Sequence, residues 1–233
     1  LQRGDVLLAA KKFNEAELLF PQSPWAAKSA IMAAYAYYTQ DYYTDSIYEL
    51  ERYLSTYPKH KDKVYAHFLL GMIFYEQIVD EKKDLKSILN AKEEFLFIIR
   101  EYPNSEFAMN AKFKINLIDE ILAAKEMYLG RYYLNKSKWI PALNRFKEVI
   151  NEYNTTIYVE EALHRLVEVN YRLGLVEESK KYANILGYNY QSSEWYKNTF
   201  RVFNKDYRDS IKELQKDKKK KNNWMRVFKG LFE

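Results

Sequence analysis

The sequence predicts an all-α fold made of consecutive helix–turn–helix repeats. Glycine and proline number only 6 and 5 in 233 residues, which leaves few turns and favours long helices with short connections. No run alternates strictly between apolar and polar residues, as a half-buried strand would. Small and aromatic residues instead recur at fixed distances, and this recurrence divides the chain into about five repeats and a C-terminal capping helix.

The spacing is clearest in the fourth repeat. Gly130 and Tyr133 precede a polar turn, Asn135–Lys138, and Ala142 and Phe146 follow in the expected second helix. These distances are typical of the tetratricopeptide repeat, a unit of about 34 residues. The small residues let two helix backbones approach where they cross, and the aromatic residues fill the space beside the crossing. We therefore expect a tetratricopeptide-repeat superhelix.

The first repeat fits this template poorly. Gly4 would lie in its first helix, and Ala16 and Phe20 in its second. A closing proline is expected about eight residues after Phe20, yet Pro21 follows at once. Either the repeat is truncated or about seven residues are missing, and we favour the second because a helix ending at Phe20 would not cover its neighbour. The chain also opens as if inside a helix, so we expect that its natural N-terminus is absent.

The second and third repeats follow the template more closely. The second has its packed and closing positions at Ala34, Tyr37, Ser46, Leu50, Tyr53 and Pro58. The third has them at Leu70, Gly71, Phe74, Ala91, Phe95, Ile98 and Pro103. An insertion of about eight residues falls within 79–90, and its charged composition predicts a solvated loop or a short helix.

The C-terminal half begins with a long helix. Ser105 is expected to cap it, and it would run for about 45 Å to Leu134 as both a connector and the first helix of the fourth repeat. A last helix over about Ser193–Lys205 would cover the exposed end of the array. The fifth repeat has its template positions at Leu163, Val167, Asn170, Ser179, Ala183 and Leu186. The predicted domains are an N-terminal lobe over 1–104, a C-terminal lobe over 105–210 and a basic amphipathic tail over 211–233.

The positive charge of the chain is concentrated in this tail. Residues 211–233 hold eight Lys or Arg against three Asp or Glu, a net charge of +5, and the whole chain also carries +5. The repeats therefore sum to zero, which gives no support to nucleic-acid binding. The tail would lie on an anionic membrane or dock on a partner, or it is simply disordered. Its apolar residues at helical spacing include Trp224, Phe228, Leu231 and Phe232.

The sequence shows no sign of catalysis, a metal or a cofactor. The chain has no cysteine, and no run of 18 apolar residues that would span a membrane. No nucleophile motif or glycine-rich phosphate loop is present. Because His60, His67 and His164 have no partners at ligand spacing, we expect structural or surface roles for them.

A peptide groove is the better-supported hypothesis. In repeat arrays, residues of the first helices that lie off the packing stripe line the concave side. In repeats two and three all six of these positions are aromatic or Met, which suits an extended peptide with aromatic side chains. For any single one of them, a place in the helix–helix core is the simpler interpretation. The six are Tyr35, Tyr38, Tyr65, Phe68, Met72 and Tyr75.

Several local motifs in the repeats are more specific than the repeat template itself. They are Ser23–Ala26, Tyr75–Ile78, Glu101–Ala108, Lys125–Met127, Gly130–Tyr133, Glu160–Leu166, Leu186–Tyr190 and Ser193–Tyr196. These motifs resemble the BamD family, the repeat-built lipoproteins of the outer-membrane β-barrel assembly machinery. The similarity covers about residues 1–200 and is strongest to α-proteobacterial members.

The resemblance implies a set of partners and a location. Members of the family are anchored to the periplasmic face of the outer membrane by a lipidated N-terminal cysteine, which this sequence lacks. Their C-terminal repeats bind the POTRA domains of BamA, and other assembly lipoproteins join them. Their N-terminal repeats are associated with the C-terminal targeting peptides of unfolded outer-membrane proteins. The family arginine that pairs with an acidic residue of the last POTRA domain corresponds here to Arg145, preceded by Asn144.

Two alternatives remain open from the sequence. One is a different tetratricopeptide-repeat adaptor or scaffold of the bacterial cell envelope. The other is a peripheral membrane protein organised by its C-terminal tail. An adaptor of another kind would not bind POTRA domains, and liposome binding that survived deletion of 211–233 would contradict the membrane hypothesis.

Overall fold

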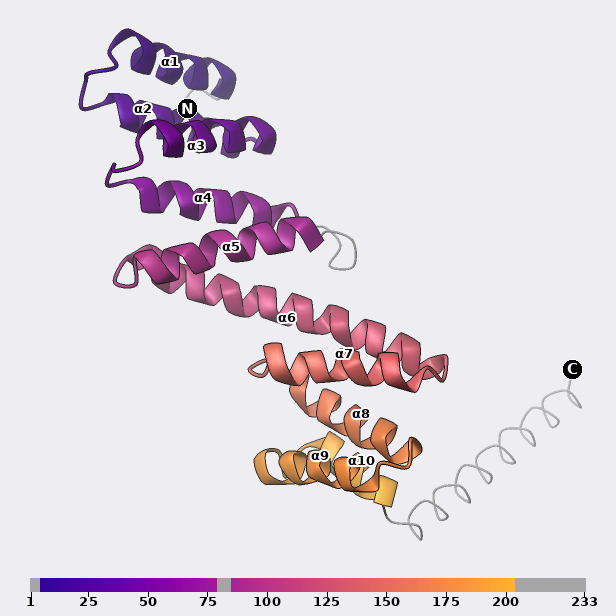
Figure 1. The fold of residues 1–233 in the computed structure, drawn as a ribbon. Coiled ribbons are helices and arrows are strands. Elements are labelled where there is room, and N and C mark those ends of the chain that lie inside the picture. Colours follow the sequence, from indigo (N-terminus) through magenta and orange to yellow (C-terminus); the bar gives the residue numbers. More distant parts are fainter. Residues whose placement is uncertain (1–4, 79–84, 204–233) are drawn as a thin grey trace, which may run out of the picture. The chain divides into compact units, whose positions relative to one another are not determined.

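The computed structural model describes residues 5–78 and 85–203, and every regular element within them is an α-helix (Figure 1). This confirms the predicted all-α repeat fold. The chain forms two compact units, residues 1–121 and 122–233, and the boundary falls inside the long helix α6. The boundary predicted at 104/105 lies in the turn just before that helix.

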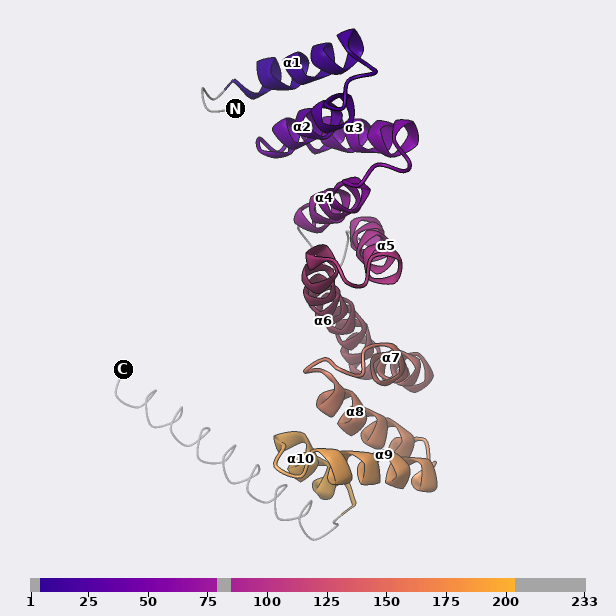
Figure 2. The ribbon, with the colours of Figure 1, turned by 90° about the vertical axis from the view of Figure 1, so that its left-hand side faces the viewer.

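Consecutive helices pack against each other within each unit (Figures 1 and 2). Unit 1 contains α1 (Val6–Leu19), α2 (Ala26–Tyr38), α3 (Tyr43–Thr56), α4 (Lys63–Glu76), α5 (Leu85–Glu101) and the first part of α6 (Glu106–Asn135). Unit 2 contains the rest of α6 with α7 (Trp139–Glu152), α8 (Val159–Arg172), α9 (Val176–Asn189) and α10 (Glu194–Phe203).

Two repeats are held by the same glycine–phenylalanine crossing. A Cβ atom added to Gly71 would lie 2.7 Å from Cε1 of Phe95, and one added to Gly130 would lie 2.5 Å from Cε1 of Phe146. Both phenylalanine side chains are completely buried. The ring of the second helix therefore occupies the space that a side chain on the first helix would need, as the spacing predicts.

The second and fifth repeats use a hydroxyl at the crossing instead. Ser46 Oγ donates a hydrogen bond to the carbonyl oxygen of Ala34 at 2.8 Å, and Ser179 Oγ donates to that of Val167 at 2.9 Å. All four residues are buried. Each serine is small enough for the close approach, and its hydroxyl is satisfied by the backbone of the first helix.

The predicted first repeat was wrong. Residues 6–19 form one continuous helix with no turn, and its buried small residue is Ala10, packed near Val6 against α2. Ala16 and Phe20 are exposed rather than packed, and Gly4 lies outside the described residues.

The length of α1 explains the error. Like α3, α1 has 14 residues and ends two residues before a proline, Pro21 for α1 and Pro58 for α3. It therefore matches a complete second helix, and no residues are missing before Pro21. The predicted register lies seven residues too late, because Ala9 and not Ala16 stands twelve residues before the proline.

The last residues of the segment that holds the predicted insertion in the third repeat are helical. Residues 79–84 lie outside the described residues, but 85–90 form the first turns of α5. Ile88 is completely buried there, together with Ala91 and Phe95. These positions are three and four residues apart, so Ile88 extends the apolar stripe of the helix by one turn.

The long helix and the capping helix are confirmed. Helix α6 has 30 residues, and the N–H of Ala108 donates to Ser105 Oγ at 3.1 Å. Helix α10 packs on α8 and α9, and the N–H of Trp195 donates to Ser193 Oγ at 3.0 Å. The end of the predicted last helix and the predicted tail residues Trp224, Phe228, Leu231 and Phe232 lie outside the described residues.

A buried polar contact attaches α10 to the array. His164 Nδ1 lies 2.9 Å from Thr199 Oγ1, and both residues are almost completely buried. Burial lowers the pKa of His164; Glu168 and Glu161 act to raise it, and Arg165 acts to lower it further. The imidazole is therefore neutral in the folded protein at neutral pH.

We predict that Gly130→Ala destabilises the protein by about 1–3 kcal/mol. The new methyl group would overlap the ring of Phe146, which outweighs the gain of about 0.5–1 kcal/mol in helix propensity. Urea unfolding measures the change. In a Phe146→Leu background the same substitution should be much less harmful, and an equal loss in both backgrounds would contradict the crossing argument.

We also predict that stability decreases as the pH falls below about 6.5. The unfolded chain protonates His164 near that pH, whereas the folded chain resists protonation until lower pH, so protons favour unfolding. Urea unfolding at about pH 7.5 and about pH 5.5 should show a steeper loss for the wild type than for His164→Gln. Equal losses would contradict the buried neutral histidine.

Candidate functional site

A cavity of about 430 Å³ lies between α2 and α4 beside the start of α6, all within unit 1. The alanines of α2 are buried against the neighbouring helices. The bulkier residues of α2 therefore lie on its other face, where the cavity is. We call this cavity the aromatic groove. Its lining residues are Lys28, Ile31, Met32, Tyr35, Asp62, Val64, Tyr65, Glu106 and Phe107.

Two of the six predicted peptide-binding residues, Tyr35 and Tyr65, line this groove. The ring centroids of Tyr65 and Phe107 are 5.8 Å apart, and Phe68 lies behind them, 5.3 Å from Phe107. Burial raises the pKa of Tyr65 to about 12, so its hydroxyl keeps its proton and remains available as a donor. Sequence reasoning missed Phe107, although it lies inside a motif of the family resemblance.

The other predicted positions make contacts elsewhere in the unit. Tyr38 Oη donates to Glu76 Oε1 at 2.7 Å. The ring of Tyr75 lies 4.2 Å from Lys114 Nζ. Met72 is half-buried on α4 and does not line the cavity. All six side chains are thus half-buried, but only two face the groove.

Charged residues stand at the edge of the aromatic groove. Lys28 Nζ lies 5.4 Å from the ring centroid of Trp25, and Asp62 Oδ2 lies 3.8 Å from His60 Nδ1. Glu106 is exposed at the start of α6. The groove therefore combines an aromatic interior with a polar rim, the usual composition of a ligand pocket.

The predicted docking residue Arg145 lies on α7 in unit 2. Its Nη1 donates to Glu126 Oε2 at 3.0 Å, with 43% of the Arg145 side chain and 14% of the Glu126 side chain exposed. Asn144 beside it is exposed. The guanidinium is thus held by a carboxylate of α6, while nearly half of the side chain remains open to solvent.

A second ion pair joins α6 to α8. Arg131 donates to both carboxylate oxygens of Glu161, at 2.9 and 2.5 Å, and Arg165 Nε lies 3.3 Å from the same carboxylate. Burial acts to raise the pKa of Glu161, but the two guanidinium groups hold it below its usual value. Because Arg131 and Glu161 belong to motifs of the family resemblance, those motifs have a structural role here.

The crossings, the capping helix and the groove between first helices define a tetratricopeptide-repeat protein. Among the described residues, none of the helices combines the length and the apolar composition needed to cross a bilayer.

Comparison with known proteins gives the family. A family model described as "YfiO: Outer membrane lipoprotein" matches residues 1–186. The outer membrane protein assembly factor BamD of Caulobacter vibrioides is 37% identical over 204 residues, 88% of this chain and 67% of that protein. BamD of Rickettsia prowazekii is 36% identical over 206 residues, which cover 85% of this chain and 82% of that protein. BamD of Neisseria gonorrhoeae is 30% identical over 182 residues, which cover 74% of this chain and 68% of that protein.

The chain therefore belongs to the BamD family of outer membrane protein assembly factors. This confirms the resemblance drawn from the motifs, including the similarity to α-proteobacterial members.

We predict that Arg145→Glu destabilises the protein by about 0.5–1 kcal/mol more than Arg145→Gln. The reversed charge would face the carboxylate of Glu126, whereas glutamine only removes the pair. Thermal unfolding measures the difference. Adding Glu126→Lys to Arg145→Glu should restore the lost stability, because the pair then again joins opposite charges. If stability is not restored, the two side chains do not interact.

Proposed function

We propose that this chain is a non-enzymatic assembly factor for outer-membrane β-barrel proteins, acting by binding. Unit 1 holds an extended segment of an unfolded client in the aromatic groove. Unit 2 docks on the POTRA region of BamA, and other assembly lipoproteins join the complex. In this proposal an N-terminal lipid anchor holds the protein at the periplasmic face of the outer membrane. The observation that carries the proposal is the aromatic groove in a member of the BamD family.

The aromatic groove has suitable chemistry for the client segment. Tyr35, Tyr65 and Phe107 offer ring faces and edges to an aromatic side chain of the peptide. Met32 is an unbranched, adaptable neighbour that tolerates rings of different size. A cavity of about 430 Å³ is large enough for one such side chain and part of the backbone beside it.

Arg145 supports the docking half of the proposal. Its guanidinium offers five N–H donors in a planar fork, and the contact with Glu126 uses only one of them. Because Glu126 already restrains the side chain, less conformational entropy is lost when a partner carboxylate binds. An acidic residue of a POTRA domain is a suitable partner for this site.

We predict that Tyr65→Leu weakens binding of a client peptide that ends in an aromatic residue by about tenfold. The substitution removes a ring and a hydroxyl from the groove while keeping an apolar side chain. Fluorescence anisotropy with a labelled C-terminal peptide of an outer-membrane protein measures the affinity. Tyr188→Leu, at a tyrosine 86% exposed in unit 2, is the matched control and should bind normally. Unchanged affinity of Tyr65→Leu would contradict the groove.

We predict that Arg145→Gln weakens binding to the last POTRA domain of BamA by about tenfold. Glutamine is preferable to glutamate here because it does not repel Glu126. Surface plasmon resonance measures the affinity, and Glu126→Gln serves as a control that removes the internal pair but keeps the arginine. If Arg145→Gln binds as well as the wild type, the docking site lies elsewhere.

A further inference from the structure

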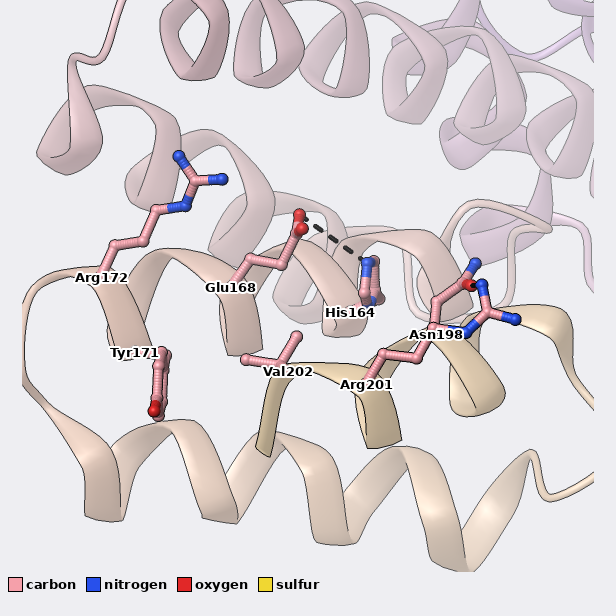
Figure 3. A pocket seen from close by; sticks show the side chains of 7 residues that line it. All are labelled: His164, Glu168, Tyr171, Arg172, Asn198, Arg201 and Val202. Atoms are coloured by element: carbon pink, nitrogen blue, oxygen red, sulfur yellow. Dashed lines mark hydrogen bonds and ion pairs between the residues drawn. The ribbon is translucent and has the colours of Figure 1, made fainter. Parts of the chain in front are cut away.

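A second groove, about 470 Å³ in volume, lies between α8 and α10 in unit 2 (Figure 3). Helix α8 is the first helix of the fifth repeat, and α10 follows α9 where the next first helix would stand. The groove therefore has the same construction as the aromatic groove between α2 and α4. Its lining is different, because side chains of charged and amide residues replace most of the rings.

Two of the oxygen acceptors in this groove already take part in polar contacts. Glu168 Oε2 accepts a hydrogen bond from Arg165 Nη1 at 2.7 Å and lies 3.7 Å from His164 Nε2. Asn198 Oδ1 accepts from Arg201 Nη1 at 2.7 Å. Figure 3 shows Arg172 on one side of the Glu168–His164 pair and Asn198 with Arg201 on the other.

Arg172 and Asn198 keep N–H groups that can donate to a ligand. The Arg172 guanidinium lies 5.0 Å from the ring centroid of Trp139, and stacking engages its face while its N–H edges stay available. Within residues 5–78 and 85–203, Arg172 has no ion pair with a carboxylate. The side-chain amide of Asn198 keeps its N–H₂ group for a further acceptor, since its oxygen is used by Arg201.

The groove carries a positive charge, which is the sign that attracts a negatively charged ligand. Among the described residues, the positive charge of Arg172 has no carboxylate partner, whereas the negative charge of Glu168 is already paired with Arg165. His164 is neutral because burial lowers its pKa. A ligand that supplies negatively charged acceptors would satisfy both the unused donors and the surplus charge.

We propose that the groove between α8 and α10 binds a carboxylate-bearing peptide segment of a partner protein, with Arg172 and the Asn198 amide as its donors. A planar guanidinium fork fits a carboxylate with two parallel hydrogen bonds. The open groove between two first helices suits an extended segment, as in the aromatic groove. This site is independent of the proposed client groove and of Arg145.

An NMR titration tests the proposal. The probe is an acetylated and amidated hexapeptide with two glutamates at its centre, compared with the same peptide carrying two glutamines. The indole N–H of Trp139 and the side-chain amide of Asn198 report binding at the groove. The glutamate peptide should shift both signals and bind about tenfold more tightly than the glutamine peptide. Equal affinity of the two peptides, or no shift with either, overturns the proposal.

Variants distinguish specific binding in the groove from a general attraction of the peptide to positive charge on the protein. Arg172→Gln should abolish the preference for the glutamate peptide, and Arg172→Lys should weaken it because the charge stays but the fork is lost. Lys181→Gln is the charge-matched control, since it removes one positive charge from a side chain 67% exposed on α9 outside the groove. Wild-type binding by Arg172→Gln, or an equal loss in Lys181→Gln, overturns the assignment.

Discussion

The close crossing of the two helices in each repeat is the constraint on which the remaining structure depends. At Gly71 and Gly130 the ring of a phenylalanine from the second helix occupies the place of a side chain. At Ser46 and Ser179 a small residue allows the same approach and bonds to the opposite backbone. These contacts use one face of each first helix for packing against the second helix. The residues on its other face can therefore line grooves.

The grooves show how one backbone arrangement carries different chemistry. Between α2 and α4 the lining includes Tyr35, Tyr65 and Phe107, which suit an aromatic side chain. Between α8 and α10 the lining includes Arg172 and Asn198, whose N–H groups can donate to a carboxylate. The helix crossings do not depend on these residues, so the binding face of each repeat can vary while its packing is kept.

Ion pairs between arginines and buried carboxylates join helices of neighbouring repeats. Arg52 of α3 donates to both carboxylate oxygens of Glu17 on α1, at 2.9 and 2.6 Å, and also to Glu49 at 3.0 Å. Arg131 and Glu161 join α6 to α8 in the same bidentate way. Removing the arginine from such a pair would leave a buried carboxylate with weaker compensation, which is destabilising.

The repeats from the second to the fifth, the cap at Ser105, the last helix and the family could all be predicted from the sequence. These features depend on residue size at short spacings along one chain, which can be read directly. The register of α1 became clear only from the structure, because Ala9 and Ala16 both precede a phenylalanine by four residues and the continuous helix with an exposed Ala16 excludes the second pair. Tertiary structure also decided which half-buried aromatic residues face a cavity, and that Glu126 stands opposite the arginine of α7. Each of these depends on which residue of another helix lies across the contact, and local spacing does not contain that information.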